Sequence, residues 1–270
     1  MSDSRRVYRA IKQAVKQLYP EEPQGNLARH LETLAGMVSG IVLSQSCQLP
    51  KMASKVPGNV HPDSRTKQMS RWVQNEGIRF DLYFLPFVQP LLVSLAAARP
   101  LVFIMDGSTV ARGCVTLMVS LQRAFRKGAL FTQAAYGPVT VIAWWGARYA
   151  EPIYLVSNLT SVAAACGWYQ KRMRIETFFS DQKSRGFQLH KSHLSDPDRV
   201  ARLMLAACWA YLWVIYLGTL AQQDGWQPVI HRRHRCDLSL FQLGLRLLAH
   251  LLNCDSRIPG AFTLEPESVR

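Results

Sequence analysis

The sequence has little acid: 18 aspartate and glutamate residues stand against 32 lysine and arginine residues. The net charge of +14 indicates a polyanionic partner, with nucleic acid favoured over a membrane surface. A merely soluble basic protein is the alternative. The shortage of acid is sharpest between Asp106 and Glu176, where no aspartate occurs and Glu151 is the sole carboxylate.

The six cysteines include no C-x-x-C pair and no zinc-finger spacing, which excludes the usual structural zinc modules. Several cysteines lie in apolar runs, where the reduced side chain packs as a small hydrophobic group. We therefore expect a reduced, cytoplasmic protein. The stretch 1–18 has scattered charges and no apolar core, so it does not predict a signal peptide.

The first part of the chain, residues 1–97, predicts an all-α region. Apolar periodicity and proline breaks predict helices over 5–19, 26–46, 50–55, 64–75 and 82–97. The fourth helix carries Arg65, Lys67 and Arg71. Two short helices around a turn, the second of them basic, are typical of a helix-turn-helix DNA reader, and a plain helical bundle is the alternative.

The following segment predicts strands and one prominent helix. The strands are expected over 101–105, 115–121, 139–145 and 153–157, and the helix over 169–183. Asp106 directly follows the first strand. A carboxylate at the end of a buried strand is one way to place a metal ligand, and an aspartate that only opens a turn is the alternative.

The helix over 169–183 carries one polar stripe. The stripe consists of Tyr169, Arg172, Glu176 and Lys183, which stand at i, i+3, i+7 and i+14. On a continuous helix these four positions fall within about 60° of one another. A carboxylate flanked by cations suits a site that handles metal and phosphate. A solvated helix face with an ordinary Arg172–Glu176 pair is the alternative.

The pattern Y-x2-R-x3-E-x6-K, followed by Ser184-Arg185-Gly186, resembles the Y-R-E-K signature of bacterial insertion-sequence DDE transposases. The flanking residues are similar too, and the resemblance covers at least 101–220. It implies an α/β fold with an RNase H-like mixed sheet and flanking helices over 98–253. It also implies that the helical region 1–97 contacts DNA ends, and a flexible tail is expected over 254–270.

The resemblance further implies the chemistry of the family, which is DNA strand cleavage and transfer with two Mg²⁺ (or Mn²⁺) ions about 4 Å apart. Asp106 matches the first catalytic, metal-binding acid and Glu176 matches the third. Tyr169, Arg172 and Lys183 match residues that contact the DNA end. The implied partners are double-stranded DNA of the element's terminal repeats and other transposase copies, in homo-oligomers or mixed oligomers, at the bacterial nucleoid.

The second acid of the family, an aspartate between the other two, has no counterpart here. Glu151 precedes Pro152, and we expect it to be structural. The simplest interpretation is an internal deletion near 122–128 that removes central strands together with the second ligand. We therefore predict a DDE transposase whose cleavage is impaired, or alternatively a non-catalytic DNA-binding remnant that inhibits an intact enzyme.

Two C-terminal stretches leave alternatives open. The stretch 203–223 contains no charge and is long enough to span a membrane, but a buried helix behind the signature helix is favoured, with no membrane association expected. His231, His234 and Cys236 have the residue types of a metal cluster. The surrounding arginines repel a cation, so a surface or phosphate-facing loop over 224–237 is favoured.

Overall fold

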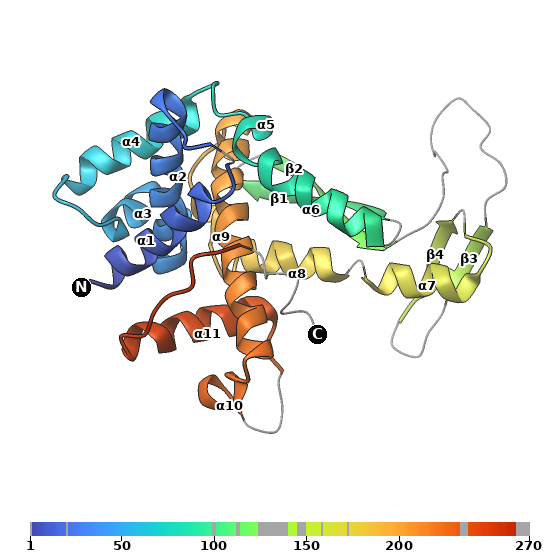
Figure 1. Ribbon diagram of the computed structural model, residues 1–270. Helices are drawn as coiled ribbons and strands as arrows, with labels where there is room; N and C mark the ends of the chain where they lie inside the picture. Colours follow the sequence, from blue (N-terminus) through green and yellow to red (C-terminus); the bar gives the residue numbers. More distant parts are fainter. Residues whose placement is uncertain are drawn as a thin grey trace. The chain divides into compact units, whose positions relative to one another are not determined.

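The computed structural model describes residues 2–19, 21–98, 101–111, 114–123, 140–144, 150–157, 159–171, 173–232 and 237–262. It is mostly helical with small antiparallel sheets, and all the helices predicted over 1–97 have counterparts (Figure 1). The elements are α1 (Asp3–Lys16), α2 (Gly25–Ser44), α3 (Leu49–Lys55), α4 (Pro62–Gln74), α5 (Phe80–Tyr83), α6 (Leu85–Ala98), β1 (Leu101–Ala111), β2 (Cys114–Arg123), β3 (Thr140–Trp144), β4 (Ile153–Ser157), α7 (Val162–Lys171), α8 (Met173–Gln182), the 3-10 helix η1 (Leu189–Lys191), α9 (Pro197–Gln223), α10 (Gln227–Ile230) and α11 (Leu240–Asn253).

The chain forms two compact units. The first comprises Met1–Gln89, Thr109–Val115 and Ser180–Arg270, and the second comprises Pro90–Ser108 and Thr116–Phe179. The helices of both chain ends therefore share one unit, which divides the chain differently from the predicted domains 1–97 and 98–253.

Part of the predicted flexible tail is packed in the first unit. Ile258 and Phe262 are buried, and the ring of Phe262 lies 4.5 Å from that of Trp209, centroid to centroid. Residues 263–270 lie outside the described residues.

Helix α9 is the centre of the first unit. The Asp196 carboxylate caps its N-terminus by accepting from the Arg199 amide at 2.8 Å. Trp209 and Trp213 on α9 are fully buried, and α9 packs against α2, α4 and α11 (Figure 1). By length and composition α9 also qualifies as a membrane span, but 56% of its most apolar window is buried within the protein. This burial favours the predicted core helix over the membrane alternative.

Two glycines allow α9 and α11 to approach closely. A Cβ atom built on Gly218 of α9 would lie 1.9 Å from the carbonyl oxygen of Leu240, and one on Gly244 of α11 would lie 1.9 Å from that of Val214. No side chain fits at either distance. The helices therefore meet backbone to backbone, and glycine is required on both sides of the crossing.

A buried arginine on the N-terminal helix α1 binds the C-terminal end of α11. Arg6 of α1 donates to the carbonyl oxygens of Leu251 at 3.0 Å and Leu252 at 3.3 Å, at the C-terminus of α11. Its guanidinium also lies 3.1 Å from the Asp255 carboxylate. The last carbonyls of a helix have no partner within the helix, so this arginine supplies donors that they lack.

Most strand residues belong to the second unit, except that Thr109–Val115, where β1 ends and β2 begins, belongs to the first. β3 and β4 pair antiparallel, with Ile142 opposite Leu155, and β1 pairs with β2 across a two-residue connection that only antiparallel strands permit. The four described strands thus form two separate two-stranded sheets, and no RNase H-like mixed sheet is present among them. The segment 122–128, where a deletion was predicted, lies outside the described residues from 124 onward.

Candidate functional site

The signature residues fall on two helices. Tyr169 lies on α7, Glu176 lies on the first turn of α8, and Lys183 directly follows α8. Arg172, which stands between the two helices, lies outside the described residues. All described residues from 169 to 182 are helical, as predicted, and the common stripe of the four signature residues stays a prediction because Arg172 is not among them. The ring of Tyr169 packs edge-on against Trp144 of β3 at 6.4 Å, which holds α7 against the β3–β4 sheet.

Asp106 does not end its strand. β1 continues to Ala111, which places Asp106 within the strand and corrects the predicted position at its C-terminal end. The Asp106 side chain lies outside what the structure describes, whereas Glu176 and Glu151 are exposed. Among the described residues, no group of three or more His, Cys, Asp or Glu side chains is arranged to hold a metal ion. Two carboxylates, Asp106 and Glu176, do not complete the donor set of a two-metal site.

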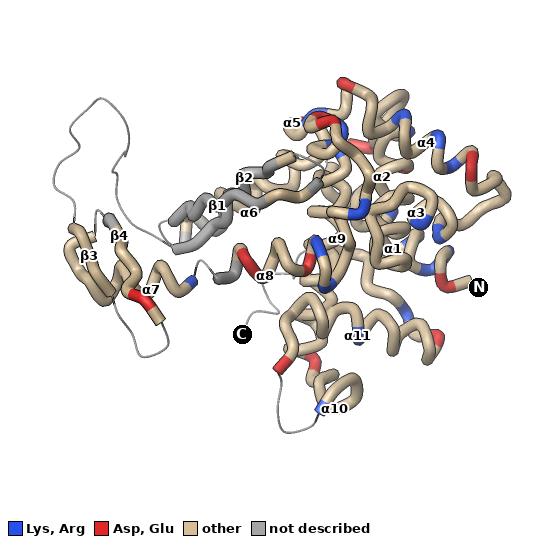
Figure 2. Tube along the Cα trace, turned by 180° about the vertical axis from the view of Figure 1, so that it is seen from behind, with Lys and Arg blue, Asp and Glu red and all other residues tan. Residues whose placement is uncertain are grey.

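The basic residues of α4 have different surroundings. Arg65 is buried and donates to the carbonyl oxygens of Val56 and Gly58 in the α3–α4 connection. This contact corrects the prediction for Arg65, because its buried guanidinium binds the turn before its own helix instead of facing DNA. Lys67 and Arg71 are exposed. Figure 2 shows further basic positions along α1 and α3.

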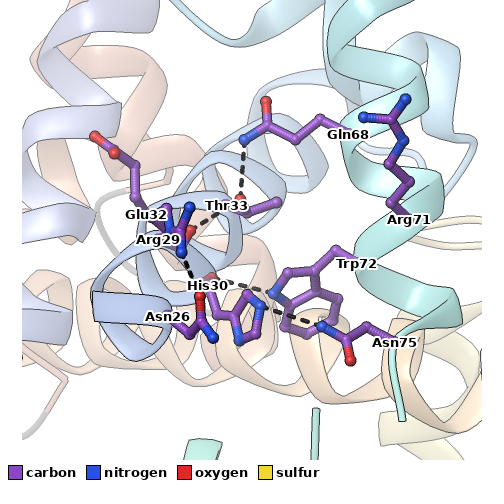
Figure 3. A pocket seen from close by; sticks show the side chains of 9 residues that line it. All are labelled: Asn26, Arg29, His30, Glu32, Thr33, Gln68, Arg71, Trp72 and Asn75. Atoms are coloured by element: carbon purple, nitrogen blue, oxygen red, sulfur yellow. Dashed lines mark hydrogen bonds between the residues drawn. The ribbon is translucent and has the colours of Figure 1, made fainter. Parts of the chain in front are cut away.

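A pocket of about 550 Å³, lined mostly by residues with polar side chains, lies between α2 and α4 (Figure 3). Each helix contributes residues at i, i+3, i+4 and i+7, which is one helix face. The residues so spaced are Asn26, Arg29, His30 and Thr33 on α2 and Gln68, Arg71 and Trp72 on α4 with Asn75 directly after it, and Glu32 completes the lining. Of these residues, only Arg71 was predicted from the sequence. The two matching patterns N-xx-RH-xx-T, from Asn26 to Thr33, and Q-xx-RW-xx-N, from Gln68 to Asn75, are the sequence feature that could have predicted this pocket.

Hydrogen bonds fix the floor of this pocket around His30. Asn75 Oδ1 accepts from the Gly77 amide at 2.9 Å, so its Nδ2 group faces His30 Nε2 at 3.1 Å and donates to it. The proton of His30 is then on Nδ1, which lies 2.6 Å from the Tyr83 hydroxyl. Burial, with a smaller contribution from the Arg29 cation, lowers the pKa of His30, which keeps the ring neutral near pH 7.

Two further bonds join the walls of the pocket. Trp72 Nε1 donates to the His30 carbonyl at 3.1 Å, and Gln68 Nε2 donates to Thr33 Oγ1 at 3.0 Å (Figure 3). Thr33 in turn donates to the Arg29 carbonyl at 3.0 Å. Hydrogen bonds across the pocket therefore hold the side chains of His30, Thr33, Gln68, Trp72 and Asn75 in place.

The predicted histidine and cysteine cluster lies only partly within the described residues. His234 and Cys236 are outside them. His231 Nε2 lies 2.7 Å from the Asp237 carboxylate, and its Nδ1 lies 3.0 Å from Arg246 Nη1. Both ring nitrogens of His231 thus have partners within the protein, which leaves the ring no lone pair for a metal.

One carboxyl is buried where α8 ends. Asp181 is 2% exposed, and its Oδ2 atom has no hydrogen-bond partner among the described residues. Burial raises the pKa of this carboxyl to about 6, opposed only in part by the Arg185 cation. Asp181 thus lowers the stability of the protein whenever it is charged.

A family model described as "Transposase DDE domain" matches residues 41–213, more than half of the chain. The chain belongs to this family. The matched range includes Asp106 and Glu176, and it confirms the resemblance to DDE transposases drawn from the sequence. Searches of the curated proteins and of the solved structures found no match. For this transposase-family protein, the Y-R-E-K assignments and the internal deletion stay predictions.

Proposed function

We propose that this transposase-family protein binds double-stranded DNA at the terminal repeats of its element and that its metal-dependent strand cleavage is impaired. The observation that carries the proposal is the acid content of the matched region: Asp106 and Glu176 are present, and no aspartate stands between them. Three carboxylates normally hold the two ions, so a chain with two loses most of the metal-dependent rate.

DNA binding is supported by charge and exposure. The net charge is +14, and Lys67 and Arg71 are exposed on α4. Lys183, Tyr169 and Arg172 are proposed contacts to the DNA end by their match to the family signature. Mg²⁺ or Mn²⁺ remains the proposed ion, which Asp106 and Glu176 would hold with an incomplete set of carboxylates.

The alternative function is a non-catalytic remnant that binds the same DNA and inhibits an intact transposase through mixed oligomers. The missing second aspartate favours this alternative over full activity. It predicts that adding the chain to an active relative lowers strand transfer without any cleavage of its own.

The test is binding of the purified chain to labelled duplex from the repeats that flank its gene, across a salt series. We expect binding that weakens linearly in log affinity against log salt, and tighter binding to repeats than to scrambled duplex. Equal affinity for both duplexes would show that the chain does not distinguish terminal repeats from other DNA. No binding at 50 mM salt would refute the proposed DNA binding.

A further inference from the structure

The α2–α4 pocket carries more positive charge than its lining suggests at first. Arg29 and Arg71 occupy the same i+3 position on the two facing helices. Glu32 is the only acid of the lining, and it accepts from Lys12 Nζ at 2.6 Å and from the Tyr8 hydroxyl at 3.2 Å. The Lys12 ammonium, mainly through this hydrogen bond, lowers the pKa of Glu32. The positive charge of Lys12, which lies outside the pocket, thus offsets the negative charge of the ionised Glu32 carboxylate. The two arginines then give the pocket a net positive charge.

The geometry favours a phosphate-bearing ligand. Arg29 is on one wall and Arg71 on the other, and both are exposed toward solvent (Figure 3). A guanidinium presents a planar fork of donors that matches the oxygens of a phosphate. The volume of about 550 Å³ lies within the range of roughly 300–1,000 Å³ that holds a small organic group, more than a bare phosphate needs.

We propose that the α2–α4 pocket holds the sugar-phosphate backbone of a DNA strand, with Arg29 and Arg71 as its phosphate contacts. This inference rests on the proposed DNA binding and deepens it. A DNA strand is favoured over a free nucleotide because α3, which packs against both α2 and α4, carries the exposed Lys51 and Lys55, and α4 carries the exposed Lys67. These lysines offer contacts to neighbouring phosphates. Asn26 Oδ1 accepts from Arg29 Nη2 and so positions this guanidinium at the pocket. Contacts to phosphate carry no sequence information, so binding at this pocket is independent of the DNA sequence.

The test compares Arg29→Gln, Arg71→Gln and the double variant with the wild type in the duplex-binding salt series. Each lost phosphate contact lowers the slope of log affinity against log salt by about 0.9, and the double variant by about 1.8. The wild type should therefore lose about 3.5-fold more affinity than each single variant between 50 and 200 mM salt. Arg71→Lys keeps the charge and should keep the slope.

The matched control is Arg5→Gln, which removes an exposed arginine of α1 outside the pocket and should leave the slope unchanged. Since Arg29 and Arg71 are exposed, all variants should show the thermal melting of the wild type by circular dichroism. If the pocket variants have the same slope as Arg5→Gln, the inference is wrong, but the proposed function stands as long as the wild type binds duplex. If the wild type itself does not bind duplex, both the inference and the proposed function are wrong.

Free phosphate sources form a separate arm of the test. ATP and inorganic phosphate are added at millimolar concentration to the bound duplex and, separately, to the free protein in a thermal shift assay. If ATP and phosphate displace the duplex only as much as their ionic strength accounts for, the result supports the DNA strand as the ligand of the pocket. A thermal shift with ATP that disappears in Arg29→Gln and Arg71→Gln, together with an unchanged duplex slope, would overturn it in favour of a nucleotide pocket.

Discussion

The crossing of α9 and α11 predicts a large effect from a small substitution. In Gly218→Ala, the new Cβ would lie 1.9 Å from the Leu240 carbonyl oxygen, whereas ordinary contact begins at 3.4 Å, so one helix must move by about 1.5 Å. Because the obstacle is backbone, no side-chain rotation relieves it. Overpacking costs about 1–3 kcal/mol and here falls at the upper end, while alanine gains about 1 kcal/mol in helix propensity. We expect a net loss of about 2 kcal/mol or more.

Gly36→Ala is the matched control. Gly36 also lies inside a helix of the first unit, but its Cβ would meet Val56 at 3.7 Å, which is ordinary contact. This variant should be as stable as the wild type or up to about 1 kcal/mol more stable. The assay is urea unfolding followed by the fluorescence of the buried tryptophans of α9. Equal unfolding midpoints for Gly218→Ala and Gly36→Ala would refute the close crossing.

Two further predictions concern buried charges of the first unit. The Asp181 pKa, raised to about 6, makes the folded state lose stability as pH rises from about 4 through 6. Asp181→Asn should therefore exceed the wild type by on the order of 2 kcal/mol at pH 8 and match it near pH 4, measured by urea unfolding, and a pH-independent difference would contradict this. Arg6→Ala leaves the carbonyls at the end of α11 without donors and should cost about 2–4 kcal/mol, whereas Arg5→Ala at an exposed position should stay within about 0.5 kcal/mol. Equal losses in a thermal melt would count against the buried role of Arg6.

The helices were predictable because their signals are local. Apolar periodicity and proline breaks depend on neighbouring residues only, and they located α1 to α4 within a few residues. The uncharged stretch 203–223 was correctly predicted as a buried helix, since its tryptophans and small residues suit packing against other helices. Its partners α2, α4 and α11 come from distant parts of the sequence, so periodicity gave no hint of which faces meet.

The candidate site was less predictable for the same reason. Arg65 has the sequence context of a surface arginine, yet it binds the carbonyls of the turn that precedes its own helix, which only the three-dimensional path reveals. The strand that contains Asp106 continues through a polar Asp-Gly-Ser stretch that is typical of a turn. The pocket residues Arg29 and Asn75 lie far apart in sequence, and each alone is typical of a solvated helix face.

The central claim is DNA binding without strand cleavage, and a cleavage assay on labelled terminal-repeat duplex with Mg²⁺ or Mn²⁺ tests it most directly. The protein is first brought to saturation, as judged by the binding assay, so that absence of product cannot result from absence of complex. We predict bound duplex with no metal-dependent nicking above that of Asp106→Ala. Nicking that requires metal and disappears in Asp106→Ala would contradict the claim, and Glu151 would then be the first residue to substitute in search of the second acid.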